Sequence, residues 1–485
     1  MIRLLTAAGE LELPDQDLSL DIANPYFQTD AIPGTTTLPF DLPWSKANLR
    51  ALNFPDRYRG PGGPPPVAAQ LYLDGPLYRT GKLVYQALDA KARKLSYTFV
   101  ADAADLATDI RDVLLTALDL GTVPLQRTPS TADYALAPVR NAAFCGEKNP
   151  AFTSGVVNYY AGGAFPQGAG YPLAPMPYVL PILRKVLAAF GWTLTGPWLD
   201  DPEVQTLVMY SDCMLATAAT EVVLARHVPA ISVGAFLLGL QNACCLGYDF
   251  NPLRKELRVK ALREVVAAAR AGYVDREGTR QKATPNETNG FWLRSAPDTE
   301  DELDKTLDVA WQQLRVGAGG EVVEGGAGSL HEVRAGDKLL PARTWLLPAI
   351  EAAGAGPEFE MGEDSRVGLR LLFYRGLQPD SQGNAYPLAS REAANLAGDP
   401  VGAYALSWAG PKGLYAQWHR PWLDFRARAV ASEYETRFRI ADLQALDPGV
   451  AERLDEHLHF WEKISVKVRG DQRLSTATVT YRELL

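Results

Sequence analysis

The chain has 485 residues, of which 47% are hydrophobic, and its formal net charge at pH 7 is −9. This length suffices for two to four domains with ordinary cores, and the hydrophobic content excludes a disordered chain. The negative charge argues against a nucleic-acid-binding surface as the main activity, because its contact with phosphates would be repulsive. Glycine and proline number 41 and 35 and indicate many turns and short strands.

The cysteine content and hydropathy indicate the compartment. Four cysteines in so long a chain provide no disulfide framework, and Cys244 and Cys245 lie in an apolar run where we expect buried thiols. The first residues lack the apolar core of a signal peptide, and no window of about 18 apolar residues predicts a membrane span. We therefore expect a protein that is made in the cytoplasm and has no membrane segment.

Residues 1–120 show patterns typical of strands. Ser45 is a suitable N-cap for a short helix that ends near Leu52. An amphipathic pattern over 102–118 predicts a longer helix. Between them, three segments with turn residues at their junctions predict an antiparallel meander, at 69–73, 77–87 and 95–101.

Two segments lack periodicity. Residues 121–175 are rich in Gly, Pro, Tyr and Asn, and we interpret them as an extended arm or an excursion over the surface. Residues 271–305 are polar and contain the acidic run Asp298–Asp304, which has no calcium-loop spacing. We interpret this second segment as a linker whose acidic face is solvated.

Residues 176–270 combine helical patterns with a hairpin. One apolar face recurs over 177–190 and predicts a helix. Ser232 is the expected N-cap of another helix, which a hairpin over 246–259 and a short helix over 262–269 follow. This order is typical of a small α+β domain inserted between β regions.

The last part of the chain, 306–485, predicts a second β region. Alternation over 433–440 is followed by two strands, 461–468 and 475–481, which predict a closing hairpin. The tripeptide Arg469-Gly470-Asp471, which some adhesion receptors read, falls where that hairpin needs a turn. Shorter strand candidates lie in a glycine-rich frame near 311–316, 321–323, 331–334 and 343–347.

The stretch 366–425 contains the densest set of large apolar residues. It begins with a strand-like run at 367–375. Leu414, Trp418, Trp422 and Phe425 then recur at helical spacing, so they share one face, and Pro421 among them predicts a short or kinked helix. A carbohydrate platform is one alternative for Trp408, Trp418, Trp422 and Trp461, but helical or strand spacing favours a core or a subunit contact.

Metal-ligand patterns are incomplete. His331-Glu332 begins an HExxH motif, but Ala335 stands where the second histidine is required. His457 and His459 share one strand face, and the nearest candidates for a third ligand are Asp455 and Glu456. Since paired surface histidines are common without a metal, we expect no metal site.

Other catalytic signatures are also missing. The glycine runs Gly317–Gly320 and Gly325–Gly328 complete neither dinucleotide nor P-loop motifs, so we interpret them as loop glycines. No nucleophile motif is present, and no carboxylate pair stands out among 57 acidic residues for sugar hydrolysis. The sequence therefore predicts no enzyme, no catalytic residues and no cofactor.

Four groups of residues together resemble the hub proteins at the tip of phage tails and of related contractile injection machines. They are Ala23–Phe27 with Thr37–Pro43 and Asn53–Arg57; Pro177–Leu187 with Phe190–Trp192; Ile231–Leu237 with Leu246–Phe250; and Leu372–Gly376 with Gly413–Phe425. Each group is short, but their order and spacing cover most of the chain.

The resemblance implies a mainly β fold with α+β insertions. We expect two tail-tube-like β-barrel domains and a smaller helix–hairpin–helix domain. The implied division is 1–120 for the first barrel, 121–175 for the arm, 176–270 for the α+β insertion, 271–305 for the linker and 306–485 for the second barrel.

The resemblance also implies a function. Three copies would form a ring at the end of the tail tube, present six barrels to the six-fold tube and form part of the channel through which DNA passes. Expected partners are the tube protein, a spike or other baseplate proteins, and the tape measure protein as a further candidate. Alternatives are a carbohydrate-binding or glycoside-acting surface β protein, and another ring or adhesion component of a tail.

Overall fold

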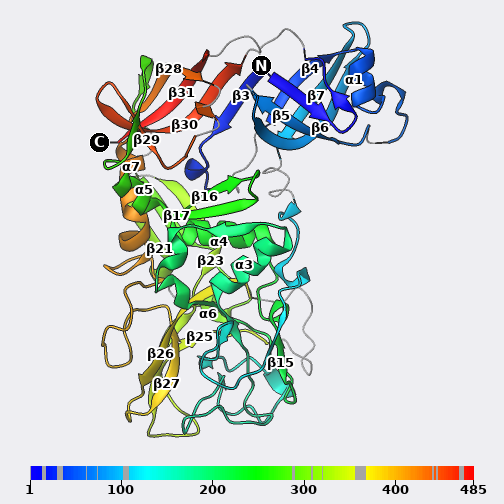
Figure 1. The fold of residues 1–485 in the computed structure, drawn as a ribbon. Helices are drawn as coiled ribbons and strands as arrows, with labels where there is room; N and C mark the ends of the chain where they lie inside the picture. The colour runs from blue at the N-terminus through cyan, green and yellow to red at the C-terminus, as the bar shows by residue number, and fades with distance from the viewer. Residues whose placement is uncertain are drawn as a thin grey trace.

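The computed structural model describes residues 2–13, 18–29, 37–61, 63–73, 75–101, 109–286, 290–306, 310–318, 320–354, 367–439, 442–443, 446–468 and 474–484. The described part is mainly β, as expected. The molecule is elongated, and β-sheets from both ends of the sequence lie together at one end of it (Figure 1). The helices α3 (Val179–Ala189), α4 (Val233–Cys244) and α5 (Leu262–Ala268) occupy the middle, and β26 (Leu369–Pro379) and β27 (Ala385–Ser390) lie toward the opposite end.

Strands from the first hundred residues form an antiparallel sheet in the order β2-β1-β5-β6-β7-β4. Their bounds are Ile2–Thr6 (β1), Gly9–Glu10 (β2), Thr37–Pro43 (β4), Val67–Leu73 (β5), Leu77–Asp89 (β6) and Lys94–Ala101 (β7). The meander β5-β6-β7 and the helix α1 (Lys46–Ala51) confirm the sequence prediction. The Ser45 hydroxyl oxygen accepts a hydrogen bond from the Asn48 amide at 3.2 Å, as an N-cap does.

A second sheet runs in the order β18-β29-β30-β31-β28-β19, and β3 also pairs with β30. Its strands are Leu18–Ala23 (β3), Tyr273–Asp275 (β18), Gly278–Thr284 (β19), Ala431–Arg439 (β28), Ala451–Leu454 (β29), His457–Val468 (β30) and Leu474–Leu484 (β31). The pairing of β30 with β31 confirms the closing hairpin. Its turn, with Arg469-Gly470-Asp471, lies outside the described residues.

These two sheets share one hydrophobic core although they come from opposite ends of the chain. Leu71 and Tyr97 of the first sheet belong to the same buried cluster as Tyr434, Ile464 and Tyr481 of the second. We call the two sheets together the double-sheet unit, made of β1–β7, β18, β19 and β28–β31. Neither sheet closes on itself among the described strands, so the two barrels stay a prediction.

The middle of the molecule contains the expected helix–hairpin–helix order. Helix α4 is capped by Ser232, whose hydroxyl oxygen accepts a hydrogen bond from the Ala235 amide at 3.1 Å. It ends where Cys245 adopts a left-handed conformation, and both Cys244 and Cys245 are buried, as predicted. Helices α4 and α5 flank a hairpin, to which a further strand is added; the three strands are Thr193–Thr195 (β13), Leu246–Asn251 (β16) and Glu256–Ala261 (β17).

The interpretation of residues 121–175 as a surface excursion was wrong, because residues 134–139 and 156–160 are buried within the chain. Buried irregular backbone needs hydrogen-bond partners. Asn158 provides them, since its side-chain amide donates to the carbonyls of Ala137 and Ala174 and accepts from the Ala174 amide. The short strands here are Thr122–Pro124 (β8), Tyr134–Ala135 (β9), Val139–Arg140 (β10), Val156–Val157 (β11) and Met176–Pro177 (β12).

Residues 290–390 pair mainly among themselves and with strands that precede residue 210, rather than with the closing hairpin. The sheet orders are β11-β10-β25-β24, β14-β26-β23 with β27 on β26, and β21-β20-β22, and β15 pairs with β8. The remaining strands are Leu207–Met209 (β14), Glu221–Val223 (β15), Gly290–Ser295 (β20), Gln313–Gly317 (β21), Glu321–Gly325 (β22), Ala327–Gly328 (β23), His331–Gly336 (β24) and Thr344–Ala349 (β25). The division of the chain into domains stays a prediction.

The helical segment near residue 420 is interrupted, as Pro421 predicts. A π-helical turn, η9 (Tyr415–His419), precedes α7 (Arg420–Arg428), and Pro421 lies in the first turn of α7, where its missing N–H group is tolerated. The other helices are α6 (Glu302–Thr306) and the 3-10 turns Pro25–Phe27 (η1), Pro55–Arg57 (η2), Leu115–Ala117 (η3), Gly146–Lys148 (η4), Pro197–Asp200 (η5), Val204–Thr206 (η6), Leu224–Arg226 (η7) and Ala310–Gln312 (η8). Of the helix predicted at 102–118, residues 102–108 lie outside the described ones. Residues 110–118 form no α-helix and contain only the 3-10 turn η3, so the predicted extension to 118 was wrong.

Large aromatic rings connect this helix to the double-sheet unit. The Trp422 ring lies 5.1 Å from that of Phe27, just after β3, and the Phe425 ring lies 5.4 Å from that of Phe460 on β30. We call Phe27, Trp422, Phe425 and Phe460 the aromatic joint. Trp422 and Phe425 are both buried, so their predicted role in a core is confirmed.

Replacement of Trp422 by Ala should destabilise the chain by about 3–5 kcal/mol, because it leaves a cavity in the aromatic joint. Trp292 is a matched control, because it is only partly buried and its indole N–H donates to the Gln313 side chain. For Trp292→Ala we expect a loss of about 1 kcal/mol. Urea denaturation followed by circular dichroism measures the free energy of unfolding of both variants. Equal decreases in Trp422→Ala and Trp292→Ala would contradict the role of the aromatic joint.

His419 makes the fold sensitive to acid. Burial lowers its pKa to about 4, and its Nε2–H donates to the Ala243 carbonyl at 3.1 Å. In the unfolded chain the pKa is about 6.5, so as the pH falls from there toward 4 the unfolded chain binds a proton that the folded chain excludes. The free energy of unfolding should therefore fall by up to about 3 kcal/mol on account of His419.

The variant His419→Gln should lose less stability than the wild type between neutral pH and about pH 4.5, since glutamine keeps the donor but does not titrate. His457→Gln is the control, because the side chain of His457 is 61% exposed. Denaturant titrations at both pH values test this expectation. It fails if His419→Gln and the wild type lose stability equally.

Candidate functional site

The most concentrated group of ionisable side chains is buried in the lower half of the molecule. It contains Asp298, Asp301, Asp304, His331 and Arg370, and we call it the acidic cluster. Asp301 and Arg370 are each 1% exposed. The interpretation of this acidic run as a solvated face was therefore wrong for Asp298, Asp301 and Asp304, whose side chains are buried. Glu300 and Glu302 of the same run are exposed.

Arg370, on β26, holds two of the three carboxylates. Its Nη2 donates to Asp304 Oδ2 at 2.6 Å, and its Nε lies 3.2 Å from Asp298 Oδ2. A Cβ atom on Gly328 would overlap this guanidinium, so only glycine leaves room for it. Gly328 ends the run Gly325–Gly328, which therefore has a packing role here, in agreement with its interpretation as loop glycines.

His331 and Gln312 complete the contacts of Asp304. The His331 Nε2–H donates to Asp304 Oδ1 at 2.9 Å, and the Gln312 side-chain amide donates to the same oxygen at 3.1 Å. The His331 ring packs edge-on against the Trp311 ring, and the two ring centroids lie 5.5 Å apart. The Arg391 guanidinium lies over the Trp311 ring, 4.0 Å from its centroid. The imidazole is thus fixed in orientation by its neighbours.

The carboxyl groups at 301 and 304 have opposite electrostatic environments. Burial raises the pKa of Asp301 above its usual value, although the backbone amides of Glu351 and Leu303 donate hydrogen bonds that lower it. Burial also acts to raise the pKa of Asp304, but the hydrogen bond from His331 and the charge of Arg370 outweigh it and the pKa is lowered. Asp301 is thus the carboxylate whose charge is least compensated.

The same cluster contains the one set of potential metal ligands that the described residues offer. One ligand atom each from Asp301, Asp304 and His331 lie within 4.8 Å of one another. The sequence shows no metal motif at His331, because the HExxH pattern that begins there has Ala335 in place of its second histidine. The missed signal is the spacing of the three aspartates, every third residue from 298 to 304, which turns them toward one side of a short helical segment.

The paired histidines of the sequence analysis have other contacts. His457 Nδ1 lies 2.9 Å from a Glu483 carboxylate oxygen. The His459 ring is buried between Tyr434 and Tyr481, with both ring centroids 5.7 Å away. Burial lowers the pKa of His459. These contacts give both rings a structural role in the second sheet.

The indole rings considered as a carbohydrate platform are core residues. Trp408, Trp418, Trp422 and Trp461 are at most 3% exposed. The Trp408 indole N–H donates to the Ser295 hydroxyl at 3.1 Å, which satisfies it inside the protein. Buried rings offer no face to a sugar, so these four form no platform.

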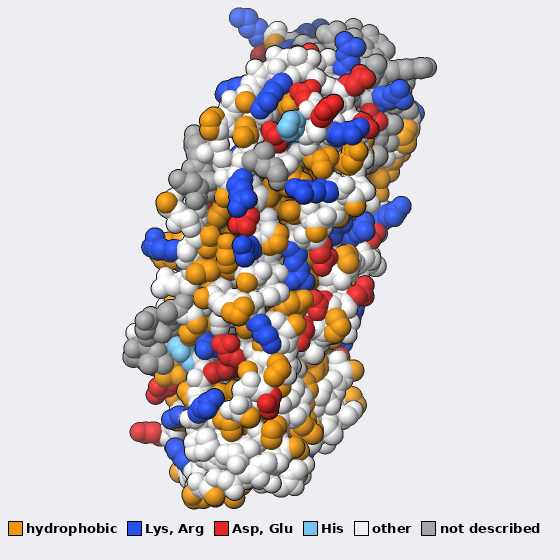
Figure 2. Space-filling view, turned by 90° about the vertical axis from the view of Figure 1, so that its left-hand side faces the viewer, with side chains coloured by type: hydrophobic (Ala, Val, Ile, Leu, Met, Phe, Trp, Pro, Cys, Tyr) orange, Lys and Arg blue, Asp and Glu red, His pale blue; other side chains and the backbone are white. Residues whose placement is uncertain are grey.

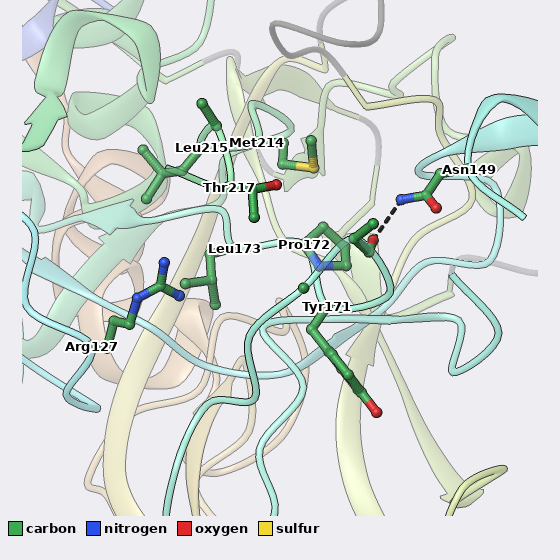
Figure 3. Close-up of a pocket in the computed structure, with 11 residues that line it drawn as sticks. Arg127, Asn149, Tyr171, Pro172, Leu173, Met214, Leu215 and Thr217 are labelled. Carbon is green, nitrogen blue, oxygen red and sulfur yellow. Dashed lines mark hydrogen bonds between the residues drawn. The ribbon is translucent and has the colours of Figure 1, made fainter. Parts of the chain in front are cut away.

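The small pocket in Figure 3 lies between the segments 127–173 and 214–217. Asn149 donates to the Ala169 carbonyl at 2.6 Å at one side of it, and Arg127 is its only charged lining residue. The cavity measures about 20 Å³, room for about one water molecule. It lacks the volume that a substrate site requires.

A wider groove of about 330 Å³ lies between α5, α7 and the end of β31. Val266, Pro421 and Phe425 line it together with Arg270 and Arg428. Figure 2 faces this side of the molecule and shows hydrophobic side chains between Lys and Arg residues there. No described helix is long and apolar enough to cross a membrane.

Comparisons with known proteins found no matching family model and no matching curated protein. Among solved structures, the chain is similar to the 43 kDa tail protein of prophage MuSo2 from Shewanella oneidensis, with 8% identity, a TM-score of 0.37, and coverage of 99% of this chain and 97% of that chain. It is also similar to a tail protein from Neisseria meningitidis MC58, with 9% identity, a TM-score of 0.34, and coverage of 99% and 96%. Scores this low establish neither a common fold nor a common function.

Arg370→Met should cost about 3–5 kcal/mol of unfolding free energy, because it leaves Asp298 and Asp304 buried without their cation. Arg453→Met is the matched control, since Arg453 pairs with Asp275 at 2.6 Å on the surface, where both side chains are largely exposed. For Arg453→Met, the decrease in the free energy of unfolding should stay below about 1 kcal/mol. Urea denaturation distinguishes the two, and a small effect at Arg370 would show that the acidic cluster tolerates the unpaired charge.

Proposed function

We propose that this chain is a structural component of a phage tail, a homotrimeric hub that adapts the six-fold tail tube to a three-fold tip or spike. The observation that carries the proposal is the double-sheet unit, in which sheets from opposite ends of the chain lie side by side on one core. Three copies of such a unit would offer six sheets to a six-fold tube.

The margins of the double-sheet unit favour a closed ring. Tyr273 and Val274 on β18 are 41% and 48% exposed, and Phe54, which follows α1, is 39% exposed. Strand β29, next to the outer strand β18, and helix α1 lie at opposite sides of the unit (Figure 1). A head-to-tail contact between unlike margins is the geometry that closes into a ring, and burying these apolar side chains would drive it.

The electrostatics suit a channel for DNA. The chain carries a formal charge of −9, so its surface would repel phosphates on average and let DNA pass without binding. In this role the partners are the tube protein, the spike or other tip proteins, with the tape measure protein as a further candidate. The protein would act by shape in the virion, with no catalytic step of its own.

The oligomeric state of the purified full-length chain tests the proposal. We expect sedimentation velocity to give three times the mass of the chain, and negative-stain electron microscopy to show rings with a central opening. The sheets of the double-sheet unit should surround that opening. A chain that stays monomeric at concentrations of tens of micromolar or more contradicts the hub.

The variant Val274→Glu should weaken the trimer at least about tenfold, because it places a charge in an apolar contact. Leu377→Glu is the matched control, since Leu377 is 52% exposed but lies on β26, away from the double-sheet unit. Sedimentation over a concentration series compares the two. If both variants assemble like the wild type, the proposed contact through Val274 is wrong. The trimer itself is tested separately, by the mass of the unmodified chain.

A further inference from the structure

The acidic cluster has more buried negative charge than its cations balance. Asp298, Asp301 and Asp304 supply three carboxylates, whereas Arg370 supplies one fixed positive charge. The two carboxylate oxygens that Arg370 contacts belong to Asp298 and Asp304, so its guanidinium is not paired directly with Asp301. A buried carboxylate without a counter-charge is costly, so the cluster needs either a proton or a cation near Asp301.

The uncompensated charge is located at the second carboxylate oxygen of Asp301, Oδ2. Asp301 Oδ1 accepts hydrogen bonds from the Leu303 and Glu351 amides, each at 3.0 Å. Asp301 Oδ2 is buried and, among the described residues, has no hydrogen-bond donor. Asp301 belongs to the group in which Asp304 and His331 also present ligand atoms. An unsatisfied oxygen in a fully buried residue is the kind of atom that calls for a ligand.

We propose that Asp301, Asp304 and His331 bind a divalent transition-metal ion, with Zn²⁺ or Co²⁺ as suitable probes. Two carboxylate oxygens and one imidazole nitrogen suit such ions, and the imidazole disfavours Mg²⁺ and Ca²⁺. The ion would take the place of the Nε2 proton that His331 donates to Asp304, which leaves a neutral imidazole protonated on Nδ1. Ligands at about 2.1 Å from a tetrahedral ion lie about 3.4 Å apart, so shifts of about 1 Å would complete the site. The ion would supply the positive charge that Arg370 does not.

The site would be structural, because it joins elements that are distant in the sequence. Asp301 immediately precedes α6, Asp304 lies in its first turn, and His331 begins β24. Gln312 and Trp311 fix Asp304 and His331 from outside the ligand set, as residues around metal ligands commonly do. Because the ion would bind only the folded chain, it would raise the thermal stability by mass action. This inference does not depend on the proposed tail function.

The test uses the full-length chain freed of metal with EDTA and then dialysed. Calorimetric titration with Zn²⁺ should give one ion per chain, and Zn²⁺ should raise the Tm. Co²⁺ should produce the visible absorption of a coordinated ion. In Asp301→Asn the affinity should fall at least about 100-fold and the Co²⁺ absorption should disappear.

Two further variants decide the outcome. His331→Gln should lose the ion as Asp301→Asn does, and it carries the test if Asp301→Asn fails to fold. His457→Gln should keep the ion, because that residue lies in the second sheet, outside the ligand set. The proposal is overturned if the wild type binds no ion, which would leave a protonated Asp301. It is also overturned if binding survives in both Asp301→Asn and His331→Gln, or if His457→Gln abolishes binding as they do.

Discussion

The aromatic joint determines how the two ends of the molecule are held together. Phe27 follows a strand near the N-terminus, Trp422 and Phe425 lie on α7, and Phe460 is on β30, so three distant segments meet in one cluster. Tilted and edge-on ring contacts have preferred angles, so the cluster restrains orientation as well as distance. In the proposed ring, the alignment of the double-sheet unit with the tube would depend on this contact.

The acidic cluster fixes the other half of the molecule by a different force. Arg370 on β26 binds Asp298, which precedes α6, and Asp304, which lies in α6, and His331 connects Asp304 to β24. Such a network adds little net stability compared with apolar packing, but it penalises any arrangement that leaves a charge unpaired. Packing of rings near one end and pairing of charges toward the other thus give one elongated body its defined shape.

The sequence predicted those features that depend on nearby residues. The caps Ser45 and Ser232, the closing hairpin and the interruption at Pro421 are local effects, and all are confirmed. The acidic run was misread because its partner Arg370 is 66 positions from Asp304, and a solvated run looks the same in sequence. The burial of residues 134–139 was equally hidden, since it depends on Asn158 satisfying backbone groups from a distance.

Strand β3 connects the two ends of the polypeptide. Near it, the Asn24 side chain donates to the Trp461 carbonyl, 437 positions away, and β3 itself pairs along β30. During synthesis, this early strand therefore has to wait until almost the whole chain has left the ribosome before its partner exists. Shortened translation products would lack that partner and could not complete the double-sheet unit. The topology thereby couples an early strand to a partner that is made more than 400 residues later, so premature termination before β30 leaves β3 unpaired.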